Sequence, residues 1–163
     1  MLKEGGPGRQ RLLVGLISDT HGLLRPEALA ALRGVDRVVH AGDIGDPDVL
    51  ARLRAVAPLT AVRGNNDRGA WARALPETAT VALGALRCYV LHDLKSLDLD
   101  PAAAGYRVVV AGHSHQPRID ERNDVLYINP GSAGPRRFRL PVAVALLELN
   151  GARIRARIEL LPV

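Results

Sequence analysis

The chain has 163 residues, of which 47% are hydrophobic and 24% are charged, a balance typical of a globular protein and not of a disordered one. No apolar run approaches the ~20 residues that a membrane-spanning helix needs, so we expect no membrane segment. The formal net charge of +5 rests on arginine and could attract phosphate-bearing substrates or nucleic acid.

The chain begins with a polar, glycine-rich stretch that lacks the apolar core of a signal peptide. We predict a flexible N-terminal tail over residues 1–10 and a single domain over residues 11–163. The length suits one domain with a substantial core. Without a targeting segment, the expected location is cytoplasmic.

The first half of the domain alternates between predicted strands and predicted helices. Pro26 starts one helix in its first turn, and Asp46 is a plausible N-cap for the next. This order favours a parallel sheet covered by helices. The predicted strands are Leu12–Ile17, Val35–His40 and Leu59–Val62, and the predicted helices are Pro26–Leu32 and Asp46 to about Val56.

The second half is richer in predicted strands. Two hairpins are indicated, at Gly84-Ala85 and at Asn150-Gly151. The single cysteine, Cys88, lies in an apolar strand and is interpreted as a small reduced core residue. We predict an α/β fold in which a two-sheet β-sandwich is flanked by helices. The predicted elements are strands at Thr78–Leu83, Leu86–Leu91, Arg107–Ala111, Val125–Ile128, Val142–Leu149 and Ala152–Leu160, and one or two helical turns at Pro101–Ala104.

Potential metal ligands follow five of these strands directly. Ligands of an open α/β sheet bind beyond the carboxyl ends of the strands, so these side chains are expected to converge on one crevice. They offer oxygen and nitrogen donors and no thiolate, which suits a dinuclear site for borderline divalent ions. The fragments are Asp19-Thr20-His21, Gly42-Asp43, Gly64-Asn65-Asn66-Asp67, His92-Asp93 and Gly112-His113-Ser114-His115.

The ordered set of fragments over residues 19–115 resembles the calcineurin-like metallophosphoesterases, in their small single-domain bacterial and archaeal branch. Residues 129–132, Asn-Pro-Gly-Ser, extend the resemblance further along the chain. The resemblance implies the αββα metallophosphoesterase fold and a phosphodiesterase. It also implies kinship with the phosphoesterase-like subunit of retromer, a protein coat.

The resemblance further implies two divalent metal ions that share Asp43 as a bridge. One ion would be bound by Asp19, His21, Asp43 and His115, and the other by Asp43, Asn65, His92 and His113. Such a pair of ions can turn a shared water into a bridging hydroxide that attacks phosphorus. These donors suit Mn²⁺, Ni²⁺, Zn²⁺, Fe²⁺ and Co²⁺ alike.

The residues around the metal site are predicted to bind and position the substrate. Many relatives have histidine where this chain has Asn66, which can donate a hydrogen bond to a phosphoryl oxygen but cannot act as a general acid near neutral pH. Asp67 is expected to orient its neighbours through hydrogen bonds, and both residues are assigned to the catalytic set. Arg136 and Arg137 could steer a phosphorylated substrate, although a solvated surface is the alternative for both.

Each ligand taken alone has an ordinary structural explanation. An aspartate before a helix is commonly a cap, and a lone histidine is commonly a core or surface residue. His40 is interpreted as a core residue or as a support for Asp43. The amides of Gly131 and Ser132 could face a phosphate or make a turn.

Two further functional classes remain open from the sequence. One is a catalytically weak or inactive protein-interaction scaffold of the same fold, and the other is a nuclease, suggested by a pI near 10.1. Aromatic residues make up 3% of the chain, which offers few platforms for base stacking, so sequence-specific nucleic-acid binding is not expected. The expected partner is a small phosphodiester or nucleotide-like substrate, and a homo-oligomer is left open.

Overall fold

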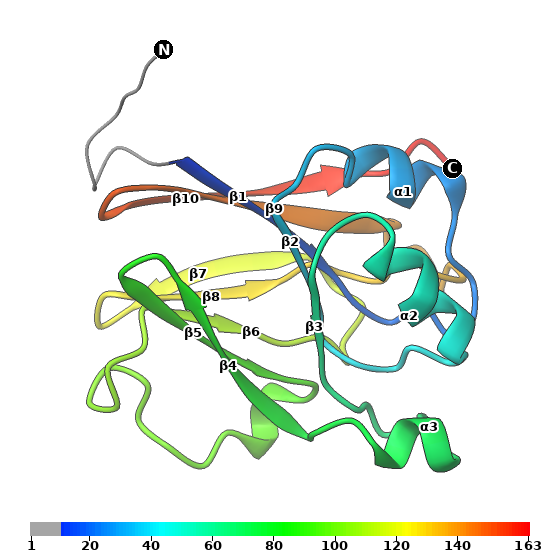
Figure 1. Ribbon diagram of the computed structural model, residues 1–163, viewed down its shortest axis with the longest axis horizontal. Coiled ribbons are helices and arrows are strands. Elements are labelled where there is room, and N and C mark those ends of the chain that lie inside the picture. Colours follow the sequence, from blue (N-terminus) through cyan, green and yellow to red (C-terminus); the bar gives the residue numbers. More distant parts are fainter. Residues whose placement is uncertain (1–10) are drawn as a thin grey trace.

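Residues 11–163 are described by a computed structural model of the chain, and the predicted tail over residues 1–10 lies outside the described residues. Two mixed five-stranded sheets pack face to face (Figure 1). The first sheet has the order β10-β9-β1-β2-β3 and contains β1 (Arg11–Ile17), β2 (Arg37–His40), β3 (Leu59–Ala61), β9 (Ala143–Asn150) and β10 (Arg153–Leu160). The second has the order β4-β5-β6-β8-β7 and contains β4 (Thr78–Leu83), β5 (Leu86–Leu91), β6 (Val108–Val110), β7 (Arg118–Arg122) and β8 (Val125–Asn129).

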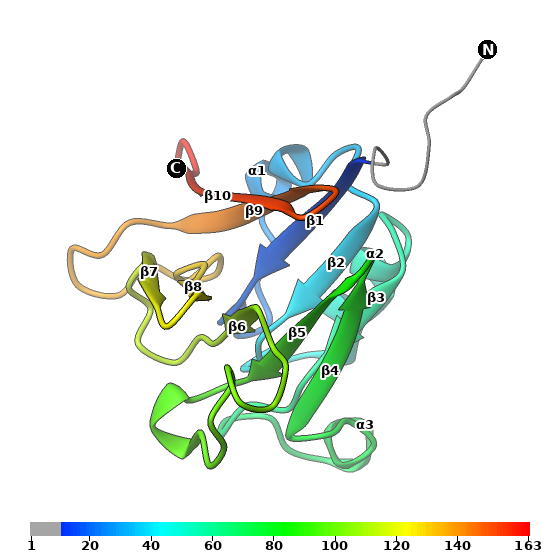
Figure 2. The ribbon, with the colours of Figure 1, turned by 90° about the vertical axis from the view of Figure 1, so that its left-hand side faces the viewer.

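The strand-then-helix order of the first half is confirmed. Strands β1, β2 and β3 are parallel neighbours, and they alternate with α1 (Pro26–Ala31) and α2 (Pro47–Arg54). Asp46 caps α2, since its carboxylate accepts a 2.8 Å hydrogen bond from the backbone N–H of Asp48. Both helices lie on the outer side of the first sheet, away from the second (Figures 1 and 2). The strand ends therefore stay uncovered by these helices.

The main core lies between the sheets and follows the alternation of side chains along the strands. Val14 and Leu16 of β1 point into it and meet the apolar side chains of the second sheet, Val90 and Val110 among them. Cys88 is buried in the same core, and burial raises the pKa of its thiol to about 12, so it is an inert core residue. Burying one such aliphatic side chain contributes roughly 1.5–3 kcal/mol.

The second sheet has no α-helix on its outer face within residues 11–163. A long connection between β5 and β6, including the 3₁₀ turn η1 (Leu94–Ser96), covers that face (Figure 2). Tyr106 packs there against Tyr89. The predicted helical turn at Pro101–Ala104 is a single turn closed by the Ala104 N–H and the Asp100 carbonyl at 2.9 Å. A short helix, α3 (Ala70–Arg73), and strand β7 were not predicted.

Strand β7 is an edge strand that pairs antiparallel with β8. Its residues are mostly exposed, so the segment lacks the apolar residues by which a strand is usually predicted. Asn123 and Asp124 join the two strands with φ of 52° and 63°, the geometry of a tight hairpin turn that this pair of residues favours. In the described part of the chain, no helix combines the length and the apolar character needed to cross a membrane.

Candidate metal centre

The connecting segments after five strands bring the predicted donors to one end of the sandwich. Hydrogen bonds between backbone groups join the segment after β1 to the segment after β2. The Asp19 N–H donates to the Gly42 carbonyl at 3.0 Å, and the His21 N–H donates to the Asp43 carbonyl at 2.9 Å. The predicted donors are placed as Asp19 and His21 after β1, Asp43 after β2, Asn65 after β3, His92 after β5, and His113 and His115 after β6.

Most of the predicted ligands adopt a left-handed backbone conformation, which is uncommon outside glycine. Aspartate and histidine tolerate it better than most residues, but it still stores strain that the surrounding structure must hold. The conformation turns the chain sharply just past each strand. The residues concerned are Asp19 (φ 56°), His21 (46°), Asp43 (57°), His113 (74°) and His115 (64°).

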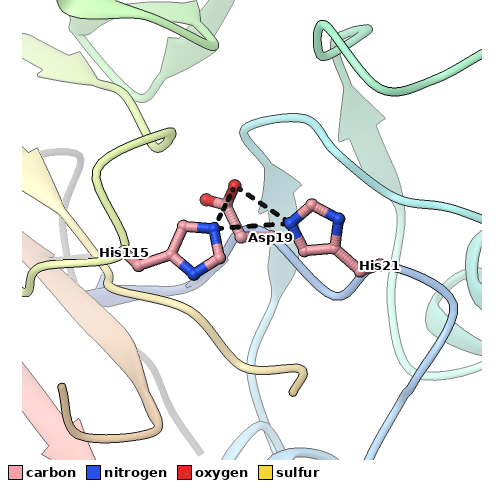
Figure 3. Close-up of side chains that lie close together, drawn as sticks. All are labelled: Asp19, His21 and His115. Carbon is pink, nitrogen blue, oxygen red and sulfur yellow. Dashed lines mark hydrogen bonds and ion pairs between the residues drawn. The ribbon is translucent and has the colours of Figure 1, made fainter. Parts of the chain in front are cut away.

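A first group of donors consists of Asp19, His21 and His115 (Figure 3). The Nε2 atoms of the two histidines are 3.4 Å apart. Asp19 Oδ1 lies 3.7 Å from Nε2 of His21 and 3.4 Å from Nε2 of His115. Three donor atoms thus face one point, although His115 is 94 residues from His21 along the chain.

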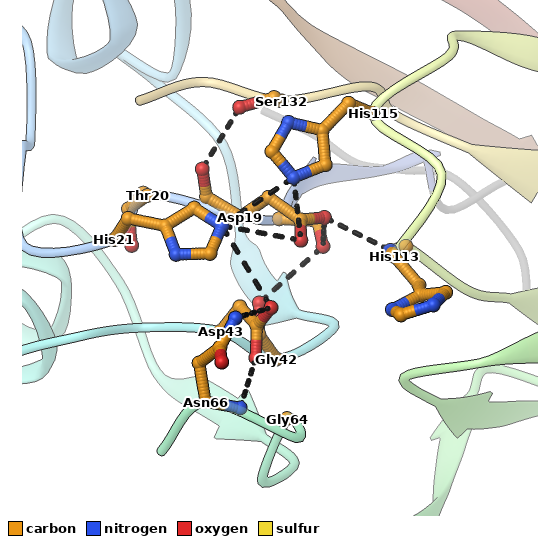
Figure 4. Close-up of polar contacts among 12 residues, drawn as sticks. Asp19, Thr20, His21, Gly42, Asp43, Gly64, Asn66, His113, His115 and Ser132 are labelled. Atoms are coloured by element: carbon orange, nitrogen blue, oxygen red, sulfur yellow. Dashed lines mark hydrogen bonds and ion pairs between the residues drawn. The ribbon is translucent and has the colours of Figure 1, made fainter. Parts of the chain in front are cut away.

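A second group forms around Asp43, which together with Asp19 and His92 offers another cluster of donors. Asp43 Oδ2 lies 3.7 Å from Nε2 of His21 (Figure 4) and 3.3 Å from Nε2 of His92. Nε2 of His92 is also 3.3 Å from Nδ1 of His113. Asp19 thus belongs to both groups, and Asp43 Oδ2 lies within 3.7 Å of a histidine from each.

Groups outside the centre, the Ala41 carbonyl and the Asp93 carboxylate, orient the rings of His92 and His113. His92 Nδ1 lies 2.8 Å from the carbonyl of Ala41 and must donate to it, which directs Nε2 toward Asp43. His113 Nε2 lies 3.8 Å from Asp93 Oδ2, so its Nδ1 is directed inward. The sequence did not assign this role to Asp93, although its place beside His92 was a signal for it.

The three polar residues after β3 differ in their contacts. Asn65 is exposed and lines a cavity of about 440 Å³ together with His92 and His113. Asn66 donates to the Asp43 carboxylate from its backbone N–H at 2.9 Å and from its side-chain amide at 3.1 Å (Figure 4).

Asp67 is buried and accepts hydrogen bonds from two glycine amides. Its carboxylate binds the N–H of Gly45 at 2.9 Å and the N–H of Gly64 at 2.8 Å. These bonds join the segment after β2 to the segment after β3. The contacts favour the orienting role expected for Asp67.

The pKa values of several donors are shifted because these side chains lie close together. Burial opposes ionisation of Asp19, but the imidazoles of His115 and His21, 3.4 and 3.7 Å from its Oδ1, outweigh it and hold the Asp19 pKa well below its usual range. Contact with Asp19 raises the pKa of His21. Burial opposes protonation of His92, but Asp43 outweighs it and raises the His92 pKa. Without metal, the histidines and the carboxylates thus stabilise each other as charged pairs.

One carboxylate oxygen of the centre lacks the partner that a cation would supply. Asp19 Oδ2 accepts from the Ser18 hydroxyl at 2.6 Å and from the His113 N–H at 3.0 Å. Asp19 Oδ1 is buried without a hydrogen bond, and among the side chains of residues 11–163 only Nδ1 of His115 shares that condition. Since Oδ1 faces two imidazole nitrogens, the donors fit a divalent ion.

Metal affinity is expected to rise with pH. A metal must displace the protons that the raised pKa values place on His21 and His92, so each proton released adds about tenfold in affinity per pH unit. In the metal-free protein these two histidines stabilise the fold below their unfolded pKa of about 6.5, and that contribution is lost as the pH rises through the raised folded values. Calorimetric titration with Mn²⁺ between about pH 6 and pH 8, in two buffers of different ionisation enthalpy, measures the affinity and the number of protons released. Affinity independent of pH, with no proton release, would contradict this expectation.

The loop after β8 supports the centre from one side. The Ser132 hydroxyl donates to the Asp19 carbonyl at 2.9 Å, and the Asn129 amide donates to the Gly112 carbonyl at 3.0 Å. The Gly131 N–H donates to Asn129 Oδ1 at 2.9 Å, which favours the turn interpretation for that amide.

The two arginines predicted to meet the substrate are placed differently. Arg136 donates to the backbone carbonyl of Val163 at 3.1 Å. Arg137 is exposed, and its charge acts to lower the pKa of His21, which places it within electrostatic reach of the centre. Arg137 is therefore the arginine near the metal ligands, whereas Arg136 is bound to another segment.

His40 belongs to neither group of donors. It is completely buried, and burial lowers its pKa to about 4, so the ring is neutral at ordinary pH. It supports the segment that carries Asp43 through the neighbouring Gly42 amide, at 3.1 Å. The prediction of a core residue is confirmed, and the support for Asp43 stays a prediction.

Comparison with known proteins gives consistent results. The family model described as the calcineurin-like phosphoesterase superfamily domain matches residues 12–152. A probable metallophosphoesterase from Methanothermobacter thermautotrophicus is 35% identical over 159 residues, covering 90% of this chain and 91% of that protein. A phosphodiesterase from Methanocaldococcus jannaschii is 30% identical over 137 residues, covering 72% and 82%. The crystal structure of Vps29 from Entamoeba histolytica, complexed with Zn²⁺, has a TM-score of 0.73 at 22% identity and covers 92% of this chain and 98% of that one.

Proposed function

Because the chain belongs to the calcineurin-like phosphoesterase superfamily, we propose that it is a metal-dependent phosphodiesterase acting on a small, nucleotide-like phosphodiester. The observation that supports this most directly is the position of Asp43, whose Oδ2 lies within 3.7 Å of a histidine from each group of donors. The relative named as a phosphodiesterase, at 30% identity, favours diesters as the substrate class.

The proposed centre holds two divalent ions with Asp43 shared between them. Bound ions would supply Lewis acidity and lower the pKa of a water enough to provide a hydroxide nucleophile at neutral pH. The proposed ligands of one ion are Asp19, His21, Asp43 and His115, and those of the other are Asp43, Asn65, His92 and His113.

The chain's own residues then position the substrate and hold charge. The side-chain amide of Asn66 lies 3.1 Å from Asp43 Oδ2, so it is close enough to the centre to donate to a phosphoryl oxygen when substrate displaces that bond. Asn66 has no proton to give to a leaving group near neutral pH. We therefore expect turnover to favour esters whose leaving groups depart as stable anions.

The proposal is tested by comparing bis(p-nitrophenyl) phosphate with p-nitrophenyl phosphate. Protein stripped of metal and resupplied with Mn²⁺, Ni²⁺ or Zn²⁺ is expected to hydrolyse the diester, at least about tenfold faster in kcat/KM than the monoester. Stripped protein without added metal is the control, and its turnover should be at background. Two ions bound per chain with no turnover of either ester would favour the scaffold over the enzyme.

Arg137 is proposed to attract the phosphodiester, and Arg137→Ala is expected to raise KM by about three- to tenfold with kcat and metal content unchanged. A positive charge near the entrance raises the local concentration of an anionic substrate, and salt screens this effect. Steady-state kinetics at low and high ionic strength measure it.

Arg136→Ala is measured in parallel, because both arginines were predicted to contact the substrate. Arg155→Ala on β10 is the matched control, since Arg155 is an exposed arginine on a strand and is expected to leave KM unchanged. An unchanged KM for Arg137→Ala would show that Arg137 is a solvated surface residue without a role in substrate binding.

A further inference from the structure

We propose that His40 is a positioning residue that fixes the two ligand-bearing segments after β1 and β2 relative to one another, and so sets the affinity of the metal centre. The inference rests on the proposed function, because it concerns the same centre. It is carried by a chain of hydrogen bonds that runs from His40 through Thr20 to Ile44 and leaves all metal ligands free.

The direction of each bond follows from the chemistry of the groups. The Gly42 N–H can only donate, so His40 Nδ1, 3.1 Å away, accepts. The neutral ring therefore carries its proton on Nε2 and donates to the Thr20 hydroxyl at 3.0 Å. The Thr20 hydroxyl in turn donates to the Ile44 carbonyl at 2.8 Å. Each donor in the chain thereby has an acceptor, and the Thr20 hydroxyl both accepts and donates.

The chain of bonds crosses between the two segments within the protein interior. Thr20 lies between the ligands Asp19 and His21, whereas Gly42 and Ile44 flank the proposed bridge Asp43. The side chains of His40 and Thr20 are both completely buried, so water cannot replace a bond that is lost.

Gly42 is the point through which His40 acts on the ligands. A Cβ at this position would lie 2.6 Å from Nδ1 of His92, so the glycine packs directly against a second proposed ligand. Its backbone has φ of 103°, and the next residue, Asp43, is also left-handed. Orienting the Gly42 amide therefore orients the strained segment that presents Asp43.

Two conservative variants test the two nitrogens of the His40 ring separately. His40→Asn places an oxygen near Nδ1 and keeps an acceptor for Gly42, while His40→Gln places an amide near Nε2 and keeps a donor for Thr20. Thr20→Val removes the hydroxyl with little change in shape. Each variant is expected to weaken Mn²⁺ binding by about 10- to 100-fold, the range for a residue that supports a ligand. Thr20→Val is expected to add less than half of its single effect, on a logarithmic scale, to His40→Asn, because His40→Asn has already lost the donor to Thr20.

The readout is the Mn²⁺ affinity of each variant by calorimetry, measured well below its melting temperature, together with the thermal stability of the metal-free protein. Val108→Ala is the control for destabilisation alone, because Val108 is a buried residue of the core between the sheets, at the start of β6, and is none of the proposed ligands. It is expected to lower the melting temperature and keep the Mn²⁺ affinity.

The outcomes separate this inference from the proposed function. Variants that lose stability like Val108→Ala but bind Mn²⁺ like the wild type would overturn the positioning role and leave the proposed function standing. Fully additive effects of Thr20→Val and His40→Asn would show that no single chain of bonds acts, and would also overturn it. A wild-type protein that binds no Mn²⁺, Ni²⁺ or Zn²⁺ would overturn the proposed function and this inference with it.

Discussion

Asp43→Asn is expected to lower kcat/KM for the diester by at least about 10³-fold, a loss of about 4 kcal/mol of transition-state stabilisation, while the protein remains folded. The substitution keeps the size of the side chain and removes its charge. His21 and His92 then lose the carboxylate that both approach, at 3.7 and 3.3 Å. Asn66 donates to both carboxylate oxygens, and an asparagine offers it only one acceptor. Kinetics with saturating Mn²⁺, together with the metal content per chain, measure the effect.

The matched control for this variant is Asp46→Asn. Asp46 caps α2 close by in the sequence, and asparagine is as good a cap as aspartate, so neither stability nor turnover should change. Asp43→Asn with full metal content and half of the wild-type turnover would contradict the bridging role.

Gly64→Ala is expected to impair both metal binding and stability, through steric overlap and not through backbone conformation. A Cβ on Gly64 would lie 2.2 Å from both the backbone nitrogen and the Oδ1 atom of Asp43, closer than any real contact (Figure 4). Overpacking of this kind costs about 1–3 kcal/mol, which lowers the melting temperature by roughly 2–4 °C per kcal/mol in a domain of this size. Since Asp43 must move, we expect Mn²⁺ affinity to fall by about 100-fold. Thermal unfolding and calorimetric titration measure the two effects.

Gly34→Ala separates this local effect from the general cost of replacing a glycine. Gly34 has φ of 84°, and a Cβ there meets nothing within 4 Å. It is expected to cost about 1–2 kcal/mol of backbone strain and to leave Mn²⁺ affinity unchanged. Equal metal affinities for Gly64→Ala and Gly34→Ala would show that Gly64 does not fix the position of Asp43.

The fold could be predicted where apolar periodicity and turn residues agree. The strands and helices of the first half carry both signals, and their boundaries differ from the prediction by one or two residues, as with β2, which begins at Arg37. Strand β7 has neither a fully buried face nor an apolar run, because it lies at the edge of its sheet. Helices cover the outer face of the first sheet, whereas within residues 11–163 a loop with one 3₁₀ turn covers that of the second.

The candidate site could be predicted at the level of which residues gather, since each donor follows a strand. Its internal supports could not, because they depend on contacts between residues far apart in sequence. Asp19 accepts a hydrogen bond from the His113 N–H, 94 residues away, and Asp93 meets His113 only after both segments have folded. The direction of the His40 ring likewise follows from neighbours that the sequence does not place beside it.

The left-handed backbone at the ligands restricts how this centre can be redesigned. Aspartate, asparagine and histidine are the residues that tolerate such a conformation best after glycine, and they are also hard or borderline donors. Replacing His115 or Asp43 with cysteine to recruit a softer metal would therefore meet a conformational cost before any question of coordination arises. Changing the metal preference of this scaffold thus requires reshaping the chain path along with the donors, and exchange of side chains alone is a poor route to it.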